Sequence, residues 1–368
     1  MASRIREKRS ISPVNLSEFE ALARKALRGP VFDHLSGGTD DEVALQENIE
    51  AFRRIQIIPR VLRDVTNRNL SATVLGQSIS FPVILAPVTC LRRFHAQGEL
   101  AAARAASAAG TIFTVSTGAC YGLDEIAKAS PGPFWLQLYA YRDKGITKGL
   151  VQRAEAVGHS AICLTADVPV GGRRERDLRN QYFYPKAMLY KNLTGLGLKG
   201  LSPQMSDEEL LAFSARELTV ALTWEYLEWL KSITKLPILL KGILSTEDAL
   251  RAVSSGMQGI VVSNHGGRQL DRAPAAIDVL QEIAAAVDGR MEILLDSGVR
   301  RGTDVLVALA LGAKAVLLGR PYAWALAANG EKGVSQALAM LREEFDIAMA
   351  LAGCASVAEI SASLVRRR

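Results

Sequence analysis

A histidine and an arginine stand three residues apart in the segment Ser263–Asp271, whose sequence is SNHGGRQLD. The segment follows the apolar run Gly259–Val262, so it is expected where a buried strand passes into a loop. His265 titrates near neutral pH and can act as a base, while Arg268 can hold a carboxylate through two parallel hydrogen bonds. The two glycines between them permit positive φ and close approach to a flat ligand. This segment could deprotonate a small anionic substrate; a structural histidine beside a solvated arginine is the alternative.

Polar residues also end the neighbouring apolar runs of the chain. They are Gln137, Tyr139, Thr165, Asp167, Lys241, Ser263 and Asp296. A buried lysine or carboxylate is costly unless it pairs with an opposite charge or binds a ligand. A lysine and two carboxylates at the ends of strands therefore indicate a functional site.

Two glycine- and arginine-containing loops follow the last two apolar runs. They are Asp296–Asp304, with the sequence DSGVRRGTD, and Leu318–Pro321, with the sequence LGRP. Glycine amides, a helix N-terminus and arginine side chains together form a phosphate site at this place in many barrels. The loops predict a phosphorylated cofactor. Neither a Gly-x-Gly-x-x-Gly after an early strand nor a Walker-type loop occurs, which argues against NAD in a Rossmann site and against ATP chemistry.

These residues must be positioned by short strands that alternate with helical stretches. The predicted strands are Phe81–Pro87, Thr111–Ser116, Phe134–Tyr139, Ala161–Asp167, Pro237–Ile243, Gly259–His265, Glu292–Gly298 and Ala315–Gly319. Eight nearly continuous apolar strands in βα alternation indicate an α/β fold, a closed parallel (β/α)8 TIM barrel with helices outside. An open doubly wound sheet is the alternative.

The order of elements predicts one domain with additions. Residues 1–12 form a disordered basic tail, 13–80 an N-terminal helical cap, 81–352 the barrel and 353–368 a C-terminal tail. The cap contains helices from Asn15, over Val31–Leu35 and over Val43–Phe52, and then a β-type segment, Ile55–Leu75. Between strands 4 and 5, an insertion over about 181–232 is expected to fold as a lid, with a loop, Gln181–Met205, and helices Asp207–Ala221 and Trp224–Ser232. Val334–Ala352 is expected as the closing helix.

Composition restricts the class of protein. The chain has 368 residues, 49% of them hydrophobic, and a net charge of +6 to which both ends contribute. The basic ends are expected to be solvated tails, and basic residues elsewhere lack the aromatic interleaving of a nucleic-acid surface. No apolar run reaches the roughly 18 residues of a membrane span. The four cysteines, Cys90, Cys120, Cys163 and Cys354, show no metal-type spacing and suit a reducing compartment.

Over about residues 14–362, the sequence resembles the family of FMN-dependent 2-hydroxy acid oxidases, which includes glycolate oxidase, lactate oxidase and mandelate-type enzymes. The resemblance is carried by Ser263–Asp271, Asp296–Asp304, Leu239–Gly242, Gln137–Tyr139 and Gly172–Glu175. Such enzymes contain FMN, and no metal is expected.

The resemblance implies a role for each residue of the site. His265 would take the proton of the substrate hydroxyl, and Asp167 would stabilise the resulting imidazolium. Arg268 and Arg174 would bind the carboxylate, and Tyr139 would hydrogen-bond to the substrate. Lys241 would lie beside the flavin and stabilise its reduced anion. The remaining contacts to FMN would come from Pro87, Val88, Thr89, Ser116, Gln137, Thr165, Ser263, Asp296, Ser297, Gly298, Val299, Arg300, Gly319 and Arg320.

Three positions depart from the family pattern. His34 stands where many members have a tyrosine that contacts the carboxylate; it could donate a hydrogen bond in its place or face away. Gly118 stands where glycolate oxidase has a tryptophan in the substrate pocket, which predicts room for an aromatic or bulky substrate unless Tyr121 or a lid residue fills the space. Thr89 stands where the family usually has alanine or glycine beside the flavin, and a larger residue there can alter the access of oxygen.

The sequence therefore predicts an FMN-dependent (S)-2-hydroxy acid oxidase that gives the 2-oxo acid and, with O2, hydrogen peroxide. A dehydrogenase of the same family that uses a quinone or another acceptor is one alternative. An FMN-barrel isomerase or a non-catalytic flavin-binding protein is the alternative of another class. His265, Arg268 and Arg174 argue against the isomerase, and the presence of His265 and Lys241 argues against a non-catalytic protein. The expected partners are a small 2-hydroxy acid, O2 or another electron acceptor, and further copies of the chain in a tetramer or octamer. Neither nucleic acid nor a membrane is expected as a partner, and a cytoplasmic location is expected.

Overall fold

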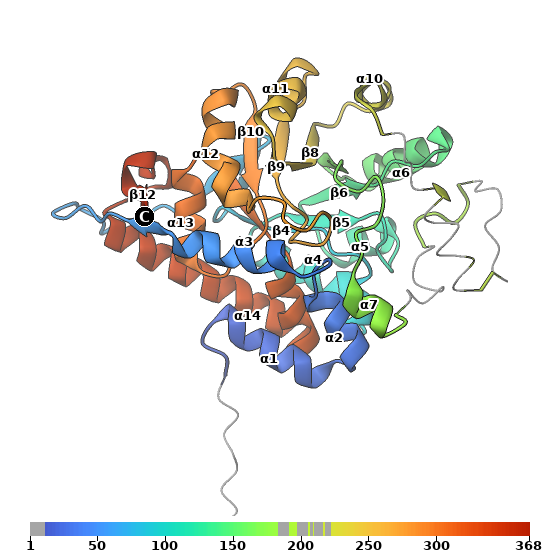
Figure 1. Cartoon of the computed structure of the whole chain (residues 1–368), viewed down its shortest axis with the longest axis horizontal. Coiled ribbons are helices and arrows are strands. Elements are labelled where there is room, and N and C mark those ends of the chain that lie inside the picture. Colours follow the sequence, from blue (N-terminus) through green and yellow to red (C-terminus); the bar gives the residue numbers. More distant parts are fainter. Residues whose placement is uncertain (1–11, 183–190, 197–204, 207–208, 210–215, 218–221) are drawn as a thin grey trace, which may run out of the picture.

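The computed structural model describes residues 12–182, 191–196, 205–206, 209, 216–217 and 222–368. Its centre is a closed barrel of parallel strands (Figure 1). The strands are β4 (Val83–Leu85), β5 (Phe113–Ser116), β6 (Phe134–Leu138), β7 (Ala161–Thr165), β8 (Ile238–Ile243), β9 (Gly259–Val262), β10 (Glu292–Leu295) and β11 (Ala315–Leu318). β11 pairs with β4 and closes the ring. The predicted barrel and its eight strands are confirmed, although the observed strands are shorter than the predicted ones.

Helices follow the strands and surround the barrel. They are α4 (Gly98–Ala108), α5 (Leu123–Ala129), α6 (Lys144–Ala156), α10 (Trp224–Ile233), α11 (Thr246–Ser254), α12 (Ala276–Val287), α13 (Gly302–Ala310) and α14 (Arg320–Ala352). The last helix was expected to begin at Val334. It begins at Arg320 and kinks at Asn329 and Gly330, whose φ of 58° a glycine adopts readily.

Alternate residues of the strands fill the inside of the barrel. The interior cluster includes Ile84, Trp135, Cys163, Leu239, Val261, Leu294 and Leu317. Val74 and Ile79 join it from a hairpin of β2 (Ala72–Val74) and β3 (Gln77–Ile79). Because side chains alternate along a strand, the residues two positions further along point the same way. These are Gln137, Thr165, Lys241, Ser263 and Asp296, so the apolar interior gives way to a polar layer at the carboxyl ends of the strands.

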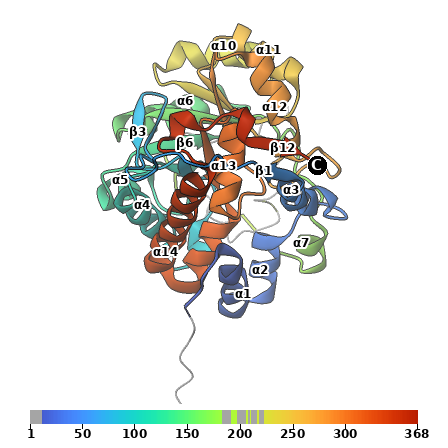
Figure 2. The ribbon, with the colours of Figure 1, turned by 90° about the vertical axis from the view of Figure 1, so that its left-hand side faces the viewer.

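The N-terminal cap contains the three predicted helices. They are α1 (Leu16–Ala26), α2 (Gly29–Ser36) and α3 (Val43–Arg53). Figure 2 shows α1 and α2 beside α14, against which α1 packs. The predicted β segment Ile55–Leu75 is wrong over most of its length, because only β1 (Ile55–Ile57) and β2 are strands there.

The arginines at the C-terminal end are exposed, as expected for a solvated end, but the segment that carries them is folded against the body. Two 3-10 turns, η2 (Val357–Glu359) and η3 (Ala362–Leu364), lead to β12 (Val365–Arg367), which pairs antiparallel with β1. Arg367 forms an ion pair with Asp278 and also donates to the backbone oxygen of Ile277. The arginines at the end of the chain are therefore held by backbone pairing and by carboxylate and carbonyl acceptors.

The cysteines differ from the expectation of reduced thiols. Cys90 and Cys120 form a disulfide. It joins η1 (Leu91–Arg93), the turn after β4, to the loop after β5. Cys163 and Cys354 are free and buried, and Cys163 packs inside the barrel as predicted.

Parts of the sequence prediction lie outside the described residues. The basic tail 1–12 falls there apart from its last residue, as do most of the loop 181–205 and of the helix 207–221. The lid and the domain boundaries therefore stay predictions. The helix expected over Trp224–Ser232 is present as α10. Within the described ranges, no helix combines the length and apolar character needed to cross a membrane.

Candidate active site

A cleft opens at the carboxyl ends of the barrel strands, where the polar layer lies. It encloses about 1030 Å³ of empty space, its open mouth included. Most of the predicted site residues line it: His34, Pro87, Val88, Thr89, Ser116, Gln137, Tyr139, Thr165, Arg174, Lys241, His265, Arg268, Asp296, Ser297, Gly298, Val299, Arg300, Gly319 and Arg320. Asp167 and Ser263 lie behind this lining and contact it, whereas Gly118 does not line the cleft.

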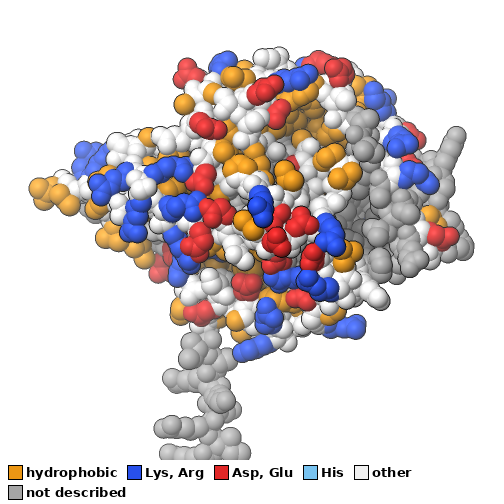
Figure 3. Space-filling view, in the orientation of Figure 1, with side chains coloured by type: hydrophobic (Ala, Val, Ile, Leu, Met, Phe, Trp, Pro, Cys, Tyr) orange, Lys and Arg blue, Asp and Glu red, His pale blue; other side chains and the backbone are white. Residues whose placement is uncertain are grey.

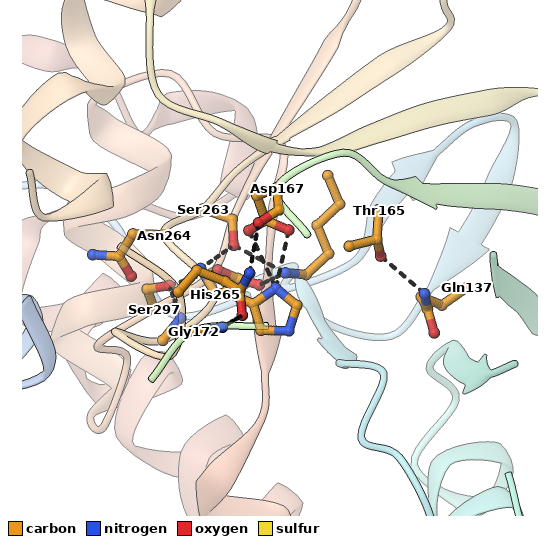
Figure 4. Close-up of polar contacts among 12 residues, drawn as sticks. Gln137, Thr165, Asp167, Gly172, Ser263, Asn264, His265 and Ser297 are labelled. Carbon is orange, nitrogen blue, oxygen red and sulfur yellow. Dashed lines mark hydrogen bonds and ion pairs between the residues drawn. The ribbon is translucent and has the colours of Figure 1, made fainter. Parts of the chain in front are cut away.

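His265 and Asp167 form a pair at the wall of the cleft (Figure 4). His265 Nδ1 lies 3.0 and 3.2 Å from the two carboxylate oxygens of Asp167. Burial lowers the pKa of His265, and the opposing effect of Asp167 does not restore it. The imidazole is therefore neutral at neutral pH. With its proton on Nδ1, facing the carboxylate, its Nε2 is left as a base.

The position of Asp167 depends on a glycine and an amide. Burial alone would raise the pKa of Asp167, but His265 and Lys241 outweigh it and hold that pKa below its usual range. A Cβ on Gly242 would lie 2.5 Å from the Asp167 side chain, so a larger residue would displace the carboxylate. Gln269 Nε2 donates to the backbone oxygen of Asp167 at 2.9 Å. The carboxylate is thus ionised and fixed behind the imidazole.

Lys241 is a buried cation in the same layer. Its Nζ lies 3.0 Å from Asp296 Oδ2 and donates to Ser263 Oγ at 3.0 Å. Burial alone would lower the pKa of Lys241, but Asp296 and Asp167 outweigh that effect and raise it. A permanent positive charge therefore lies at the floor of the cleft.

Hydroxyl and amide groups line the side of the cleft formed by β5, β6 and β7. Ser116 Oγ donates to Gln137 Oε1 at 2.9 Å, and Gln137 Nε2 donates to Thr165 Oγ1 at 2.9 Å. Thr89 Oγ1 lies 3.3 Å from Ser116 Oγ. This wall offers fixed polar groups to the edge of a flat ligand.

Arg268 is held at the mouth by the N-terminal cap. Its Nη1 donates to the backbone oxygens of His34, at 2.8 Å, and Gly37, at 2.9 Å. His34 Nδ1 lies 2.9 Å from Asp177 Oδ2, and burial lowers the pKa of His34 to about 3. A neutral His34 donates from Nδ1 to Asp177 and turns the acceptor Nε2 toward Arg268 Nη2, at 3.4 Å. His34 therefore positions Arg268 and cannot donate from Nε2.

Arg174 stands near this group, at the start of α7 (Glu175–Arg179). Its Nη1 lies 4.0 Å from Asp177 Oδ2. Its Nε is buried and has no hydrogen-bond partner within the described part of the chain. A bound carboxylate would supply the missing acceptor.

Arg300 and Arg320 form a second cationic region of the cleft. Arg320 donates to the backbone oxygens of Gly266 and Gly37, each at 2.8 Å, and opens the long helix α14. Burial lowers the pKa values of both arginines. Neither forms an ion pair with a carboxylate among the described residues. Two half-buried cations, one of them at the N-terminus of α14, fit a phosphate.

Gly118 itself does not line the cleft. A Cβ at this position would lie 2.6 Å from the Cγ2 of Thr89. The methyl group of Thr89, which does line the cleft, thus occupies the space next to Gly118. A single methyl group is much smaller than an indole, so the larger substrate pocket inferred from Gly118 stays a prediction.

Comparison with known proteins agrees with this geometry. The family model described as FMN-dependent dehydrogenase matches residues 23–367. The chain belongs to this family. It is 48% identical to the L-lactate oxidase of Nostoc sp., with 96% of this chain and 98% of that protein aligned. It is 47% identical to the glycolate oxidase of Spinacia oleracea over 95% and 94% of the two chains. The crystal structure of mandelate oxidase superposes with a TM-score of 0.89 at 46% identity, over 97% of this chain and 99% of that one.

As a member of the family, the protein is an FMN-dependent oxidoreductase of the 2-hydroxy acid oxidase type. The residues of the cleft fit FMN. Arg300 and Arg320 could hold its phosphate, Lys241 could lie against the flavin ring, and Gln137 with Thr165 could bond to the edge of the ring.

Several residues of the site were not predicted from the sequence. Leu35, Ala86, Arg93, Phe94, Gly266 and Leu317 also line the cleft, and Asp177 supports it. Arg93 follows the predicted contact Pro87–Thr89 closely, and a basic residue just after a strand end was a usable signal. Asp177 gave none, because its partner His34 is 143 positions away in the chain.

Proposed function

We propose that the protein oxidises an (S)-2-hydroxy acid to the 2-oxo acid and passes the two electrons to O2, which gives hydrogen peroxide. The observation that carries this proposal is the neutral His265, fixed by Asp167, in a cleft that also holds Arg268 and Arg174. FMN supplies the acceptor for the hydrogen that leaves C2 of the substrate.

Each residue around the cleft has a different role in the proposed reaction. Arg268 and Arg174 hold the substrate carboxylate, and Tyr139 donates a hydrogen bond to the substrate. His265 accepts the hydroxyl proton at Nε2, and Asp167 stabilises the imidazolium that forms. Lys241 supplies a fixed positive charge where negative charge develops on the reduced cofactor.

The side chain of the substrate is proposed to be bulky or aromatic. Support comes from the similarity to mandelate oxidase, one structure of which contains (S)-mandelic acid. The absence of a large side chain at Gly118 is the second support, although the methyl group of Thr89 takes up the space directly beside it. Thr89 also affects which electron acceptor can be used. Its side chain lines the cleft where oxygen would approach and can restrict that access, so a dehydrogenase that uses a quinone is the second candidate.

We also propose a cytoplasmic homo-oligomer, a tetramer or octamer. The family resemblance supports the assembly, and the free thiols of Cys163 and Cys354 support the compartment. The Cys90–Cys120 disulfide is evidence against a reducing compartment.

Stopped-flow mixing without oxygen tests the function. The yellow protein is mixed with (S)-mandelate, (R)-mandelate, lactate or glycolate, flavin bleaching is followed, and air is then admitted. We expect bleaching by the S forms and rapid recolouring in air; slow recolouring would favour the dehydrogenase. His265→Gln should slow bleaching about 10² to 10⁴-fold while FMN stays bound.

The matched control is His95→Gln, which removes an imidazole that does not line the cleft. It should bleach at the wild-type rate. A His265→Gln variant that bleaches as fast as wild type would refute the role of His265, and a wild type bleached by no 2-hydroxy acid would refute the function.

A further inference from the structure

Arg93 is a cation of the cleft to which the proposed reaction assigns no role. It ends the turn η1 after β4 and lines the cleft together with Thr89 and Phe94. Its Nη1 donates to the hydroxyl of Tyr182 at 2.7 Å. Its Nε and Nη2 each lie 3.4 Å from a backbone oxygen, those of Cys90 and Thr89. The guanidinium is therefore fixed in direction and faces the space that a substrate enters.

The segment that carries Arg93 is fastened at two points. The disulfide joins Cys90 to Cys120 in the loop after β5. The buried Glu99 accepts the backbone N–H groups of Leu91, at 2.9 Å, and Cys120, at 3.0 Å, on one carboxylate oxygen. A side chain on so constrained a turn loses little conformational entropy when it binds a ligand, which favours specific recognition.

Arg93 lies one aromatic ring away from the carboxylate-binding group. The ring of Tyr182 lies against His34 with centroids 4.9 Å apart, and the Arg93 guanidinium lies 5.5 Å from the centre of the Tyr182 ring. His34 in turn positions Arg268. Arg93 is also one of the cations that lower the pKa of His34, after the larger effect of burial. Because Tyr182 and His34 lie between Arg93 and Arg268, Arg93 could contact a part of the substrate other than the carboxylate at C1.

The lining of the cleft contains one cation to which the expected ligands assign no anionic group. Among the described residues, its cationic lining is Arg93, Arg174, Lys241, Arg268, Arg300 and Arg320, while its acidic lining is Asp296, which pairs with Lys241. The cofactor phosphate would balance Arg300 and Arg320, and the substrate carboxylate would be shared by Arg174 and Arg268. Neither of these anions is assigned to Arg93, which lines the same cleft, and a guanidinium forms strong hydrogen bonds with a carboxylate.

We infer that Arg93 binds an anionic group on the side chain of the 2-hydroxy acid, so that the enzyme prefers substrates with a second carboxylate. This inference rests on the proposed function and narrows its substrate class. It concerns specificity, since Arg93 would contact the far end of the substrate and not the reacting atoms.

Matched substrates test the inference. The pairs are 2-hydroxyglutarate against 2-hydroxypentanoate, and 4-carboxymandelate against 4-nitromandelate, so that the length of the chain or the shape of the ring substituent is similar within each pair. Wild type should show the higher kcat/KM for the member with the second carboxylate. Arg93→Met should lower kcat/KM for that member about 10- to 100-fold, since a hydrogen bond to a charged group is lost, and should change the other member less than about threefold.

Arg92→Met is the control, because it removes the same charge from an exposed neighbour that does not line the cleft. It should leave both members of each pair unchanged. Arg93→Lys, which keeps the charge but loses the planar guanidinium, should retain part of the preference. An equal loss for both members in Arg93→Met, or no preference in wild type, would overturn the inference.

Failure of the inference and failure of the proposed function give different results. If monocarboxylates bleach the flavin without a preference for the dicarboxylates, only the inference fails. If no 2-hydroxy acid bleaches the flavin, the proposed function fails. Binding of the corresponding 2-oxo acids, followed by the flavin absorbance of wild type and the variants, then decides the role of Arg93 without turnover.

Discussion

The backbone of His265 has a φ of 58°, in the left-handed region that non-glycine residues rarely adopt. Such a conformation costs on the order of 1 to 3 kcal/mol and persists only where neighbours enforce it. Here the backbone N–H of His265 donates to Ser263 Oγ, and that of Gly266 donates to Ser297 Oγ, both at 3.0 Å. These bonds hold the turn that places the imidazole against Asp167. The strained backbone of His265 therefore helps to orient its imidazole toward Asp167.

His159 shows that a buried histidine need not be functional. Its side chain is buried outside the cleft, and neither ring nitrogen has a hydrogen-bond partner among the described residues. Burial lowers its pKa to about 4. Above pH 6.5 it is neutral in both the folded and the unfolded chain. As the pH falls from about 6.5 to about 4, only the unfolded chain takes up the proton, so the folded state loses stability.

We therefore predict that His159→Leu makes stability less dependent on pH. Between pH 7 and pH 5, wild type should lose about 2 kcal/mol of unfolding free energy through this residue, and the variant should not. Urea unfolding at both pH values measures the difference. The other histidines are common to both proteins and cancel. An equal loss in wild type and variant would contradict the lowered pKa of His159.

At the scale of elements, the sequence predicts the barrel well because its signal is periodic. Each strand is a short apolar run, and the polar residue two positions after an interior one, such as Lys241 after Leu239, marks the layer of the site. The loops of the site were predicted because they directly follow these apolar runs and contain glycine and arginine. Contacts that join distant segments left no local signal, as for β1 with β12 and for His34 with Asp177. The fit of Thr89 against Gly118 also depends on packing that a sequence does not display.

The disulfide between the first two βα loops is predicted to stabilise the barrel. It closes a loop with a sequence separation of 30. Cross-linking a loop of this length restricts the unfolded chain and is worth about 3 to 4 kcal/mol in the loop-entropy description. The double variant Cys90→Ala, Cys120→Ala should lose about that much unfolding free energy in urea.

Reduction of the wild type provides the control for this prediction. Wild type that is reduced in denaturant and refolded with dithiothreitol should resemble the double variant, which should not respond to dithiothreitol. Thiol alkylation and mass spectrometry should find the two cysteines blocked in the unreduced protein. Free thiols at both positions would refute the bond.

At the scale of the whole molecule, one exposed apolar surface is a candidate for contact between copies of the chain. The segment between β1 and β2 projects from the body, at the left of Figure 1, and its tip is hydrophobic in Figure 3. Val61 is 78% exposed and Leu62 fully exposed. The backbone N–H of Arg60 donates to the backbone oxygen of Ala352 at 3.2 Å, which holds the segment at the end of α14, where Leu351 is 72% exposed.

Large side chains exposed together on one surface are typical of interfaces, because water contact with them is unfavourable. We predict that the exposed side chains of Val61, Leu62 and Leu351 are buried in the proposed homo-oligomer. Leu62→Asp with Leu351→Asp should therefore lower the molar mass measured by light scattering, since two charges would be buried without partners. Leu178→Asp, at a single exposed leucine on α7, is the matched control and should leave the mass unchanged. An unchanged mass in the double variant would place the interface elsewhere. A monomeric wild type would refute the assembly itself.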